Sequence, residues 1–149
     1  MHQVVEWALR PARDEQPRHL LGIGDVDDIL HAVAAGVDTF DCATPTRLGR
    51  HGTALVPDPA ARWRLDLTKP AQRDSRAPID ENCPCPACRD HTRAYLHYLA
   101  RATELTAARL ITLHNLTFMA LLMDGIRAAI ADGRLADYAA EAHAGRAPY

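Results

Sequence analysis

The sequence contains no uninterrupted apolar run of about 18 residues, the length that a membrane-spanning helix requires. Its N-terminal segment carries Glu6 and lacks the long apolar core of a secretory signal. There are 17 basic against 19 acidic residues, so no overall positive charge indicates a nucleic-acid-binding protein, and any such site must be local. These absences predict a soluble cytoplasmic protein of 149 residues, the size of one domain or of part of a larger one.

Lysine is almost missing as well, because Lys69 is the single lysine and every other basic residue is arginine. Any positively charged patch on this protein must therefore be made of guanidinium groups. The planar guanidinium suits bidentate contacts to phosphates and base edges better than an ammonium group does.

Cysteines are few, but three of them lie within six residues, in the motif Cys83-Pro-Cys85-Pro-Ala-Cys88. In a chain without an export signal, such a cluster indicates metal or redox chemistry rather than a disulfide framework. The two prolines prevent regular pairing and help to preset a loop that can turn three thiolates toward one point. The alternative is that these are free cysteines in a reducing compartment.

A fourth ligand would complete the tetrahedral set that zinc prefers. His114 is the best candidate, because it is expected at the start of a strong helix and can face the loop. His91 and His97 are closer in sequence but are expected on the intervening helix. A Cys₃His set with no open position would be structural rather than catalytic, and zinc is the metal it favours.

Residues 18–42 have the pattern of one βαβ unit, which implies a parallel sheet. A brief apolar run over 20–23 precedes a helical pattern with apolar residues at Val26, Ile29, Leu30 and Val33. Gly36 ends the helix, and 37–40 reads as a second strand. Asp41 and Cys42 follow at the carboxyl end of that strand, the edge where ligands and catalytic side chains collect in parallel α/β folds.

The rest of the chain reads as turns, short strands and two helices. A short helix or strand is expected near the N-terminus, a turn-rich segment over 43–55, and short strands over 54–56 and 63–67. One helix is expected over 92–108, with Tyr95, Leu99 and Ala102 on one face. The stronger helix is expected over 115–132, with a buried stripe of Met119, Leu122, Met123, Ile126 and Ile130. From Ala139 the tail is expected to be loose or weakly helical.

Three stretches carry a resemblance to a known family: HLLGIGDVDDILHAVAAGVDTFDCATPTRLGRHG, PIDENCPCPACRDHTRAYLHYL and LITLHNLTFMALLMDGIRAAIADGR. They resemble the C-terminal part of tRNA-guanine transglycosylase, the queuine tRNA-ribosyltransferase family. The resemblance covers about residues 18–138. It rests on a strand ending in Asp41, then a PTRxxR-G segment, a CxCxxC loop and a distant LHN histidine, all in order.

The resemblance implies a zinc-containing tRNA-modifying enzyme that exchanges the wobble guanine of certain tRNAs for a 7-deazaguanine such as preQ1. The family's nucleophilic aspartate falls on Asp41, which would attack C1′ of the ribose and then be displaced by the incoming base. From the residue alone, a turn or capping aspartate is the commoner use of such a residue and the reading to prefer for Asp41. The family's zinc ligands fall on Cys83, Cys85, Cys88 and His114.

The resemblance also implies RNA contacts in two segments. The wobble-region contacts fall on Thr46, Arg47, Leu48, Gly49 and Arg50. A further RNA-contacting loop falls on Gly22, Ile23, Gly24, Asp25, Val26, Asp27 and Asp28. From the residues alone, the arginines could instead be a solvated surface pair. Gly22-Ile-Gly24, at the opening of a helix, would leave backbone N–H groups free for a phosphate, and the alternative is that it is only a tight strand-to-helix turn.

The implied fold is α/β: the C-terminal portion of a (β/α)₈ barrel with a zinc-binding subdomain. The expected divisions are an N-terminal segment (1–17), the last βα units of the barrel (18–56), the zinc subdomain with C-terminal helices (57–138) and a tail (139–149). A complete barrel needs about 250 residues, so the upstream half is missing. The chain could be the C-terminal piece of a split enzyme that works with an N-terminal partner, a truncated fragment, or a non-catalytic zinc-containing module for tRNA binding or subunit interaction. A homodimer is also expected to be possible.

Overall fold

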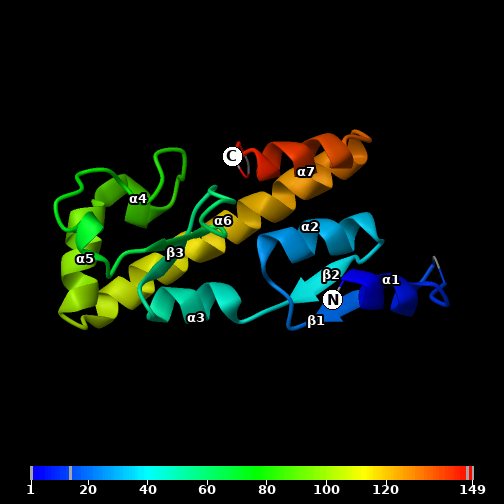
Figure 1. The fold of residues 1–149 in the computed structure, drawn as a ribbon, viewed down its shortest axis with the longest axis horizontal. Coiled ribbons are helices and arrows are strands. Elements are labelled where there is room, and N and C mark those ends of the chain that lie inside the picture. The colour runs from blue at the N-terminus through cyan, green and yellow to red at the C-terminus, as the bar shows by residue number, and fades with distance from the viewer. Residues whose placement is uncertain (1, 14, 147, 149) are drawn as a thin grey trace. The chain divides into compact units, whose positions relative to one another are not determined.

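A computed structural model describes residues 2–13, 15–146 and 148 (Figure 1). The chain divides into two compact units, residues 1–44 and 45–149, which are described separately. Both contain helices and short strands, so the protein is a mixed α/β chain.

The first unit contains the predicted βαβ arrangement. After helix α1 (His2–Leu9), strand β1 (His19–Leu21) pairs in parallel with β2 (Thr39–Asp41), and α2 (Val26–Ala34) connects them. The register sets Leu20 opposite Phe40 and Leu21 opposite Asp41. The apolar face of α2 is buried, and Gly36 follows it with φ +100°, the left-handed conformation that only glycine adopts freely.

The second unit is built along one long helix, α6 (Leu105–Ala131). The antiparallel hairpin of β3 (Thr53–Leu55) and β4 (Arg64–Asp66) packs on it through β3. Helices α4 (Pro86–Asp90) and α5 (Arg93–Arg101) contact α6 near its start, and α7 (Leu135–His143) contacts it near its end (Figure 1). A short 3₁₀ turn, η1 (Pro70–Gln72), lies in the connection between β4 and α4.

Three predictions for this unit were wrong in detail. The segment expected to be turns is largely a helix, α3 (Thr44–Arg50), because Pro45 is tolerated in a first helical turn. Helix 92–108 ends at Arg101, because Thr103 adopts φ +56° and breaks it. Helix 115–132 begins ten residues earlier, so His114 lies well inside α6. The tail from Ala139, expected to be loose or weakly helical, is helical as far as His143, the end of α7.

The predicted buried stripes also need correction. On α5 the buried residues are Leu96, His97 and Leu99, whereas Tyr95 is 43% exposed. On α6, Leu122 and Ile126 are buried as expected, but Ile130 is exposed. The buried face of α6 is completed by Ala107, Ile111, His114, Asn115, Phe118 and Ala129. The true stripe therefore contains two polar residues that an apolar pattern does not reveal.

Helix α6 is long and apolar enough to cross a membrane, judged by length and composition. One such helix is weak evidence, since the core helix of a soluble protein passes the same test. Here α6 contacts β3, α4, α5 and α7, and it carries two fully buried polar side chains.

Candidate metal centre and strand-end carboxylate

Three thiols and one imidazole converge inside the second unit. The side chains of Cys83, Cys85, Cys88 and His114 are all buried, and their possible ligand atoms lie within 4.8 Å of one another. The Nδ1 atom of His114 is 3.3 Å from the Sγ of Cys88 and 3.7 Å from the Sγ of Cys85. A tetrahedral zinc ion with ordinary bond lengths sets a sulfur and a nitrogen ligand about 3.5 Å apart. The geometry therefore fits a closed four-ligand metal site.

The imidazole of His114 is oriented by the hairpin. Its Nε2 is 2.7 Å from the carbonyl oxygen of Leu55, which can only accept, so Nε2 carries the proton and donates a hydrogen bond to that oxygen. The lone pair is then on Nδ1, the atom that faces the three sulfurs. An outer hydrogen bond of this kind fixes the tautomer and the ring direction of a histidine ligand.

The loop positions its thiols through local backbone bonds. Cys85 caps the short helix α4, because its Sγ accepts a hydrogen bond from the backbone N–H of Cys88 at 3.4 Å. Pro86 opens the helix, a position where a missing N–H costs nothing. The guanidinium of Arg93, in α5, donates hydrogen bonds to the carbonyl oxygens of Pro78 and Ile79, which precede the cysteine loop, at 2.7 and 2.8 Å. These bonds hold the segment that leads into the cysteine loop against α5.

The pKa values of the cysteine thiols also favour binding of a cation in the cluster. Hydrogen bonds from the Cys83 thiol, and then from that of Cys88, lower the pKa of Cys85 to about 3, although burial opposes this shift. Hydrogen bonding with Cys83 and Cys85, together with burial, raises the pKa of Cys88 above the ordinary thiol value of 9.0. The opposite pKa shifts of Cys85 and Cys88 mean that these two buried sulfurs do not ionise together unless a cation lies between them.

Asn115, the residue after His114, was not predicted as part of the site. It is completely buried, and its Oδ1 accepts a hydrogen bond from the N–H of Leu55 at 2.8 Å. Its Nδ2 donates to the carbonyl oxygens of Pro45 and Thr53 at 2.9 and 3.1 Å. One side chain therefore ties α6 to both α3 and β3. The sequence did contain a signal for Asn115, since it is a polar residue that directly follows a proposed metal ligand within an otherwise apolar helix.

Asp41 is the last residue of β2, as predicted, and its side chain is 64% exposed. Its Oδ1 accepts a hydrogen bond from the N–H of Gly22 at 3.0 Å and lies 3.6 Å from the Nε2 of His19. The carboxylate is thus held by the end of the neighbouring strand while one side remains open to solvent. This is a cross-strand contact and not the helix cap that the residue type alone could have suggested.

The glycine loop after β1 differs from the expectation that its N–H groups are free. The N–H of Gly22 is used by Asp41, through both the carboxylate and the carbonyl oxygen. Gly24 is buried, and a Cβ there would lie 2.5 Å from the Sγ of Cys42. Cys42 itself is half-buried, with its Sγ accepting from the N–H of Thr44 at 3.2 Å. The loop is therefore a packed connection in which Gly24 is required for space.

The remaining RNA-contact candidates have mixed exposure. In the loop, Ile23 and Asp28 are half-buried, Val26 is buried, and Asp25 and Asp27 are exposed. On α3, Thr46 and Leu48 are half-buried, whereas Arg47 and Arg50 are exposed one turn apart. Gly49 is buried against α6, where a Cβ would lie 2.8 Å from the backbone nitrogen of Thr112. The arginines thus project from a helix that packs closely on α6.

Nearly the whole chain is similar to proteins of one known family. The family model for queuine tRNA-ribosyltransferase matches residues 1–148. A queuine tRNA-ribosyltransferase of Roseiflexus sp. (strain RS-1) is 52% identical over 141 residues, 95% of this chain and 35% of that protein. The queuine tRNA-ribosyltransferase of Cereibacter sphaeroides is 44% identical over 147 residues, 99% of this chain and 38% of that protein. The chain therefore spans little more than a third of the length of these relatives.

Proposed function

Because the chain belongs to the queuine tRNA-ribosyltransferase family, we propose that it is the C-terminal part of a tRNA-guanine transglycosylase. In this proposal the enzyme exchanges guanine at the tRNA wobble position for a 7-deazaguanine base in queuosine biosynthesis. The observation that carries the proposal is an exposed, hydrogen-bonded carboxylate at a strand end, Asp41, within a chain that matches the family over residues 1–148.

Asp41 would act as the nucleophile. A carboxylate oxygen forms a bond to C1′ of the ribose as the bond from C1′ to the guanine nitrogen breaks, and guanine leaves with the electron pair. The incoming base then attacks C1′ and releases the carboxylate. Two displacements retain the configuration at C1′, and each passes through a state with positive charge on the ribose that a fixed carboxylate stabilises. The Gly22 N–H holds Oδ1 in place without covering the side chain.

The surrounding fold would position Asp41 and bind the RNA. The parallel pair β1–β2 with its helical crossover is what the last βα units of a (β/α)₈ barrel would contain. Arg47 and Arg50 are exposed guanidinium groups that suit RNA phosphates and base edges. The loop over 22–28 carries three carboxylates that would repel phosphates, so RNA contacts there would involve hydroxyl or amino donors.

Cys83, Cys85, Cys88 and His114 would hold a zinc ion whose role is structural, since all four positions of a tetrahedron are filled by protein atoms. The partners in this proposal are tRNA, the 7-deazaguanine base, and either a second copy of the chain or an N-terminal half that completes the barrel. The cytoplasm, where tRNA is modified, is the proposed location.

A non-catalytic module for tRNA binding or subunit interaction is the second candidate. The observation in its favour is that the metal cluster and the α3 arginines lie in residues 45–149, a compact unit that does not include Asp41. Such a module would keep its metal and its RNA affinity without any covalent chemistry.

Trapping of the covalent intermediate separates the two candidates. The chain, alone and with a supplied N-terminal half, is incubated with tRNA and 9-deazaguanine and resolved on a denaturing gel. The transglycosylase proposal expects an RNA-protein adduct that disappears in Asp41→Asn. Asp38→Asn is the matched control, because the amide oxygen can still accept the hydrogen bond from the N–H of Arg18. An adduct that persists in Asp41→Asn, or none with either preparation, would reject Asp41 as nucleophile.

A further inference from the structure

A groove runs between α3 and α6 on the second unit. It has a volume of about 340 Å³ and is lined by Thr46, Arg50, Ala108, Arg109, Thr112 and Leu113. Arg50 belongs to the segment that the family resemblance assigns to RNA, whereas nothing assigns a role to Arg109. The groove thus joins one expected RNA-contacting residue to an arginine from a different helix, 59 positions later in the sequence.

The two walls of the groove are held at a fixed separation. Gly49 has no side chain, and its Cα approaches α6 so closely that a Cβ would lie 2.8 Å from the backbone nitrogen of Thr112. At the start of α3, the Nδ2 of Asn115 donates to the carbonyl oxygen of Pro45 at 2.9 Å. These two contacts fasten α3 to α6 at both ends, so the groove does not depend on flexible loops for its shape.

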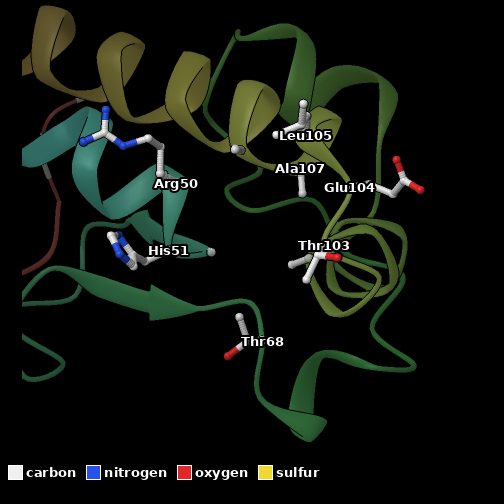
Figure 2. Close-up of a pocket in the computed structure, with 11 residues that line it drawn as sticks. Arg50, His51, Thr68, Thr103, Glu104, Leu105 and Ala107 are labelled. Carbon is white, nitrogen blue, oxygen red and sulfur yellow. The ribbon is translucent and has the colours of Figure 1, made fainter.

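The charges in the groove are uncompensated. Among the residues that the structure describes, neither Arg50 nor Arg109 has an ion pair or a side-chain hydrogen bond, and both are exposed. Arg50 also lines a neighbouring cavity of about 250 Å³, and Glu104 is an acidic residue that lines the same cavity. Figure 2 shows the Arg50 side chain directed from α3 toward α6, whereas Glu104 lies on the other side of that cavity and points away from it. The guanidinium groups therefore remain available to an anion.

We propose that Arg109 acts with Arg50 to bind the sugar-phosphate backbone of RNA in the α3–α6 groove. The proposal rests on the function proposed above and adds to it a contact from α6. Two guanidinium groups can each form paired hydrogen bonds to phosphate oxygens, and the hydroxyl of Thr112 offers a further donor. Ala108 and Leu113 provide an apolar surface for the ribose. A contact of this kind positions RNA without reading its sequence.

The test measures binding of a synthetic anticodon stem-loop to the full chain by fluorescence anisotropy over a range of salt concentrations. Arg109→Gln is expected to weaken binding about fivefold and to reduce the slope of log affinity against log salt by about 1. Arg109→Lys, which keeps the charge, is expected to restore most of that slope. The loss is expected to be equal for stem-loops with guanosine or adenosine at the wobble position, because a backbone contact does not distinguish bases.

Arg76→Gln is the matched control, since it removes the same charge from an exposed position outside the groove, and it is expected to bind as the unaltered chain does. Thermal melting of each variant confirms that the fold is intact. If Arg109→Gln binds RNA with unchanged affinity and slope while Arg50→Gln loses both, the role of Arg109 is rejected and the proposed function stands. If the unaltered chain does not bind the stem-loop either alone or with the supplied N-terminal half, both proposals are rejected.

Discussion

Asn115→Ala should be among the most destabilising single substitutions in the second unit that leave the metal ligands in place. The change removes three hydrogen bonds made by one fully buried side chain, at 2.8, 2.9 and 3.1 Å. Each such bond contributes about 1 kcal/mol net, and a buried donor or acceptor that loses its partner costs a further 1–3 kcal/mol. Leu55 is 4% exposed, and its backbone N–H loses the acceptor that it has in the parent protein.

The expected loss in the free energy of unfolding is therefore about 3–5 kcal/mol. For a protein of this size, 1 kcal/mol corresponds to a change of roughly 2–4 °C in Tm, so Tm should fall by roughly 10 °C or more. Asn82→Ala is the matched control, because Asn82 is exposed and contributes its backbone N–H, not its side chain, to the bond with Asp80. That control should change stability by less than about 0.5 kcal/mol.

Tryptophan fluorescence can follow unfolding of the second unit in denaturant. Trp63 is 3% exposed beside the hairpin, whereas Trp7 lies in α1 of the first unit, so the measurement is made in a Trp7→Phe background. Metal content is measured on the same samples, so that loss of the ion is not mistaken for loss of the hydrogen bonds. A metal-loaded Asn115→Ala protein within 1 kcal/mol of its parent would show that the three bonds do not fasten α6 to α3 and β3.

Two further predictions concern the same unit. Removal of the metal with a chelator should release three reactive thiols and expose Trp63, because structural metal binding is coupled to folding; unchanged melting after complete removal would contradict a structural role. Gly49→Ala should destabilise the protein by about 1–3 kcal/mol in denaturant unfolding, since the added Cβ would lie 2.8 Å from the backbone nitrogen of Thr112. Thr112→Ala should not rescue this variant, because the backbone nitrogen stays in place; a full rescue would mean that the side chain alone causes the clash.

The βαβ unit could be predicted from sequence because its signals are local. Apolar spacing defines α2, Gly36 ends it, and Asp41 follows a short strand. The buried cluster of three cysteines and one histidine could be predicted for a similar reason, since three cysteines within six residues limit the candidates for a fourth member to a few histidines. In both cases the informative residues are close together or chemically rare.

Tertiary contacts decide the elements that sequence reasoning missed. Helix α3 contains Pro45 and Gly49, which read as turn residues, but Pro45 is tolerated in a first helical turn and Gly49 is needed for contact with α6. The break between α5 and α6 depends on Thr103 in a left-handed conformation that threonine seldom adopts. The role of Asn115 depends on backbone groups 60 to 70 positions away. No local pattern reports such partners.

The two neighbouring side chains on α6, His114 and Asn115, bond the carbonyl oxygen and the N–H of the same residue, Leu55, and Asn115 also reaches Pro45. A metal ion bound in the cluster would therefore be linked through these four residues to α3, the helix that displays Arg50. By thermodynamic reciprocity, any factor by which the metal tightens RNA binding is also the factor by which RNA tightens metal binding. Competition for the ion by a weak chelator, repeated with and without the stem-loop, would make that coupling visible as a difference in metal retention.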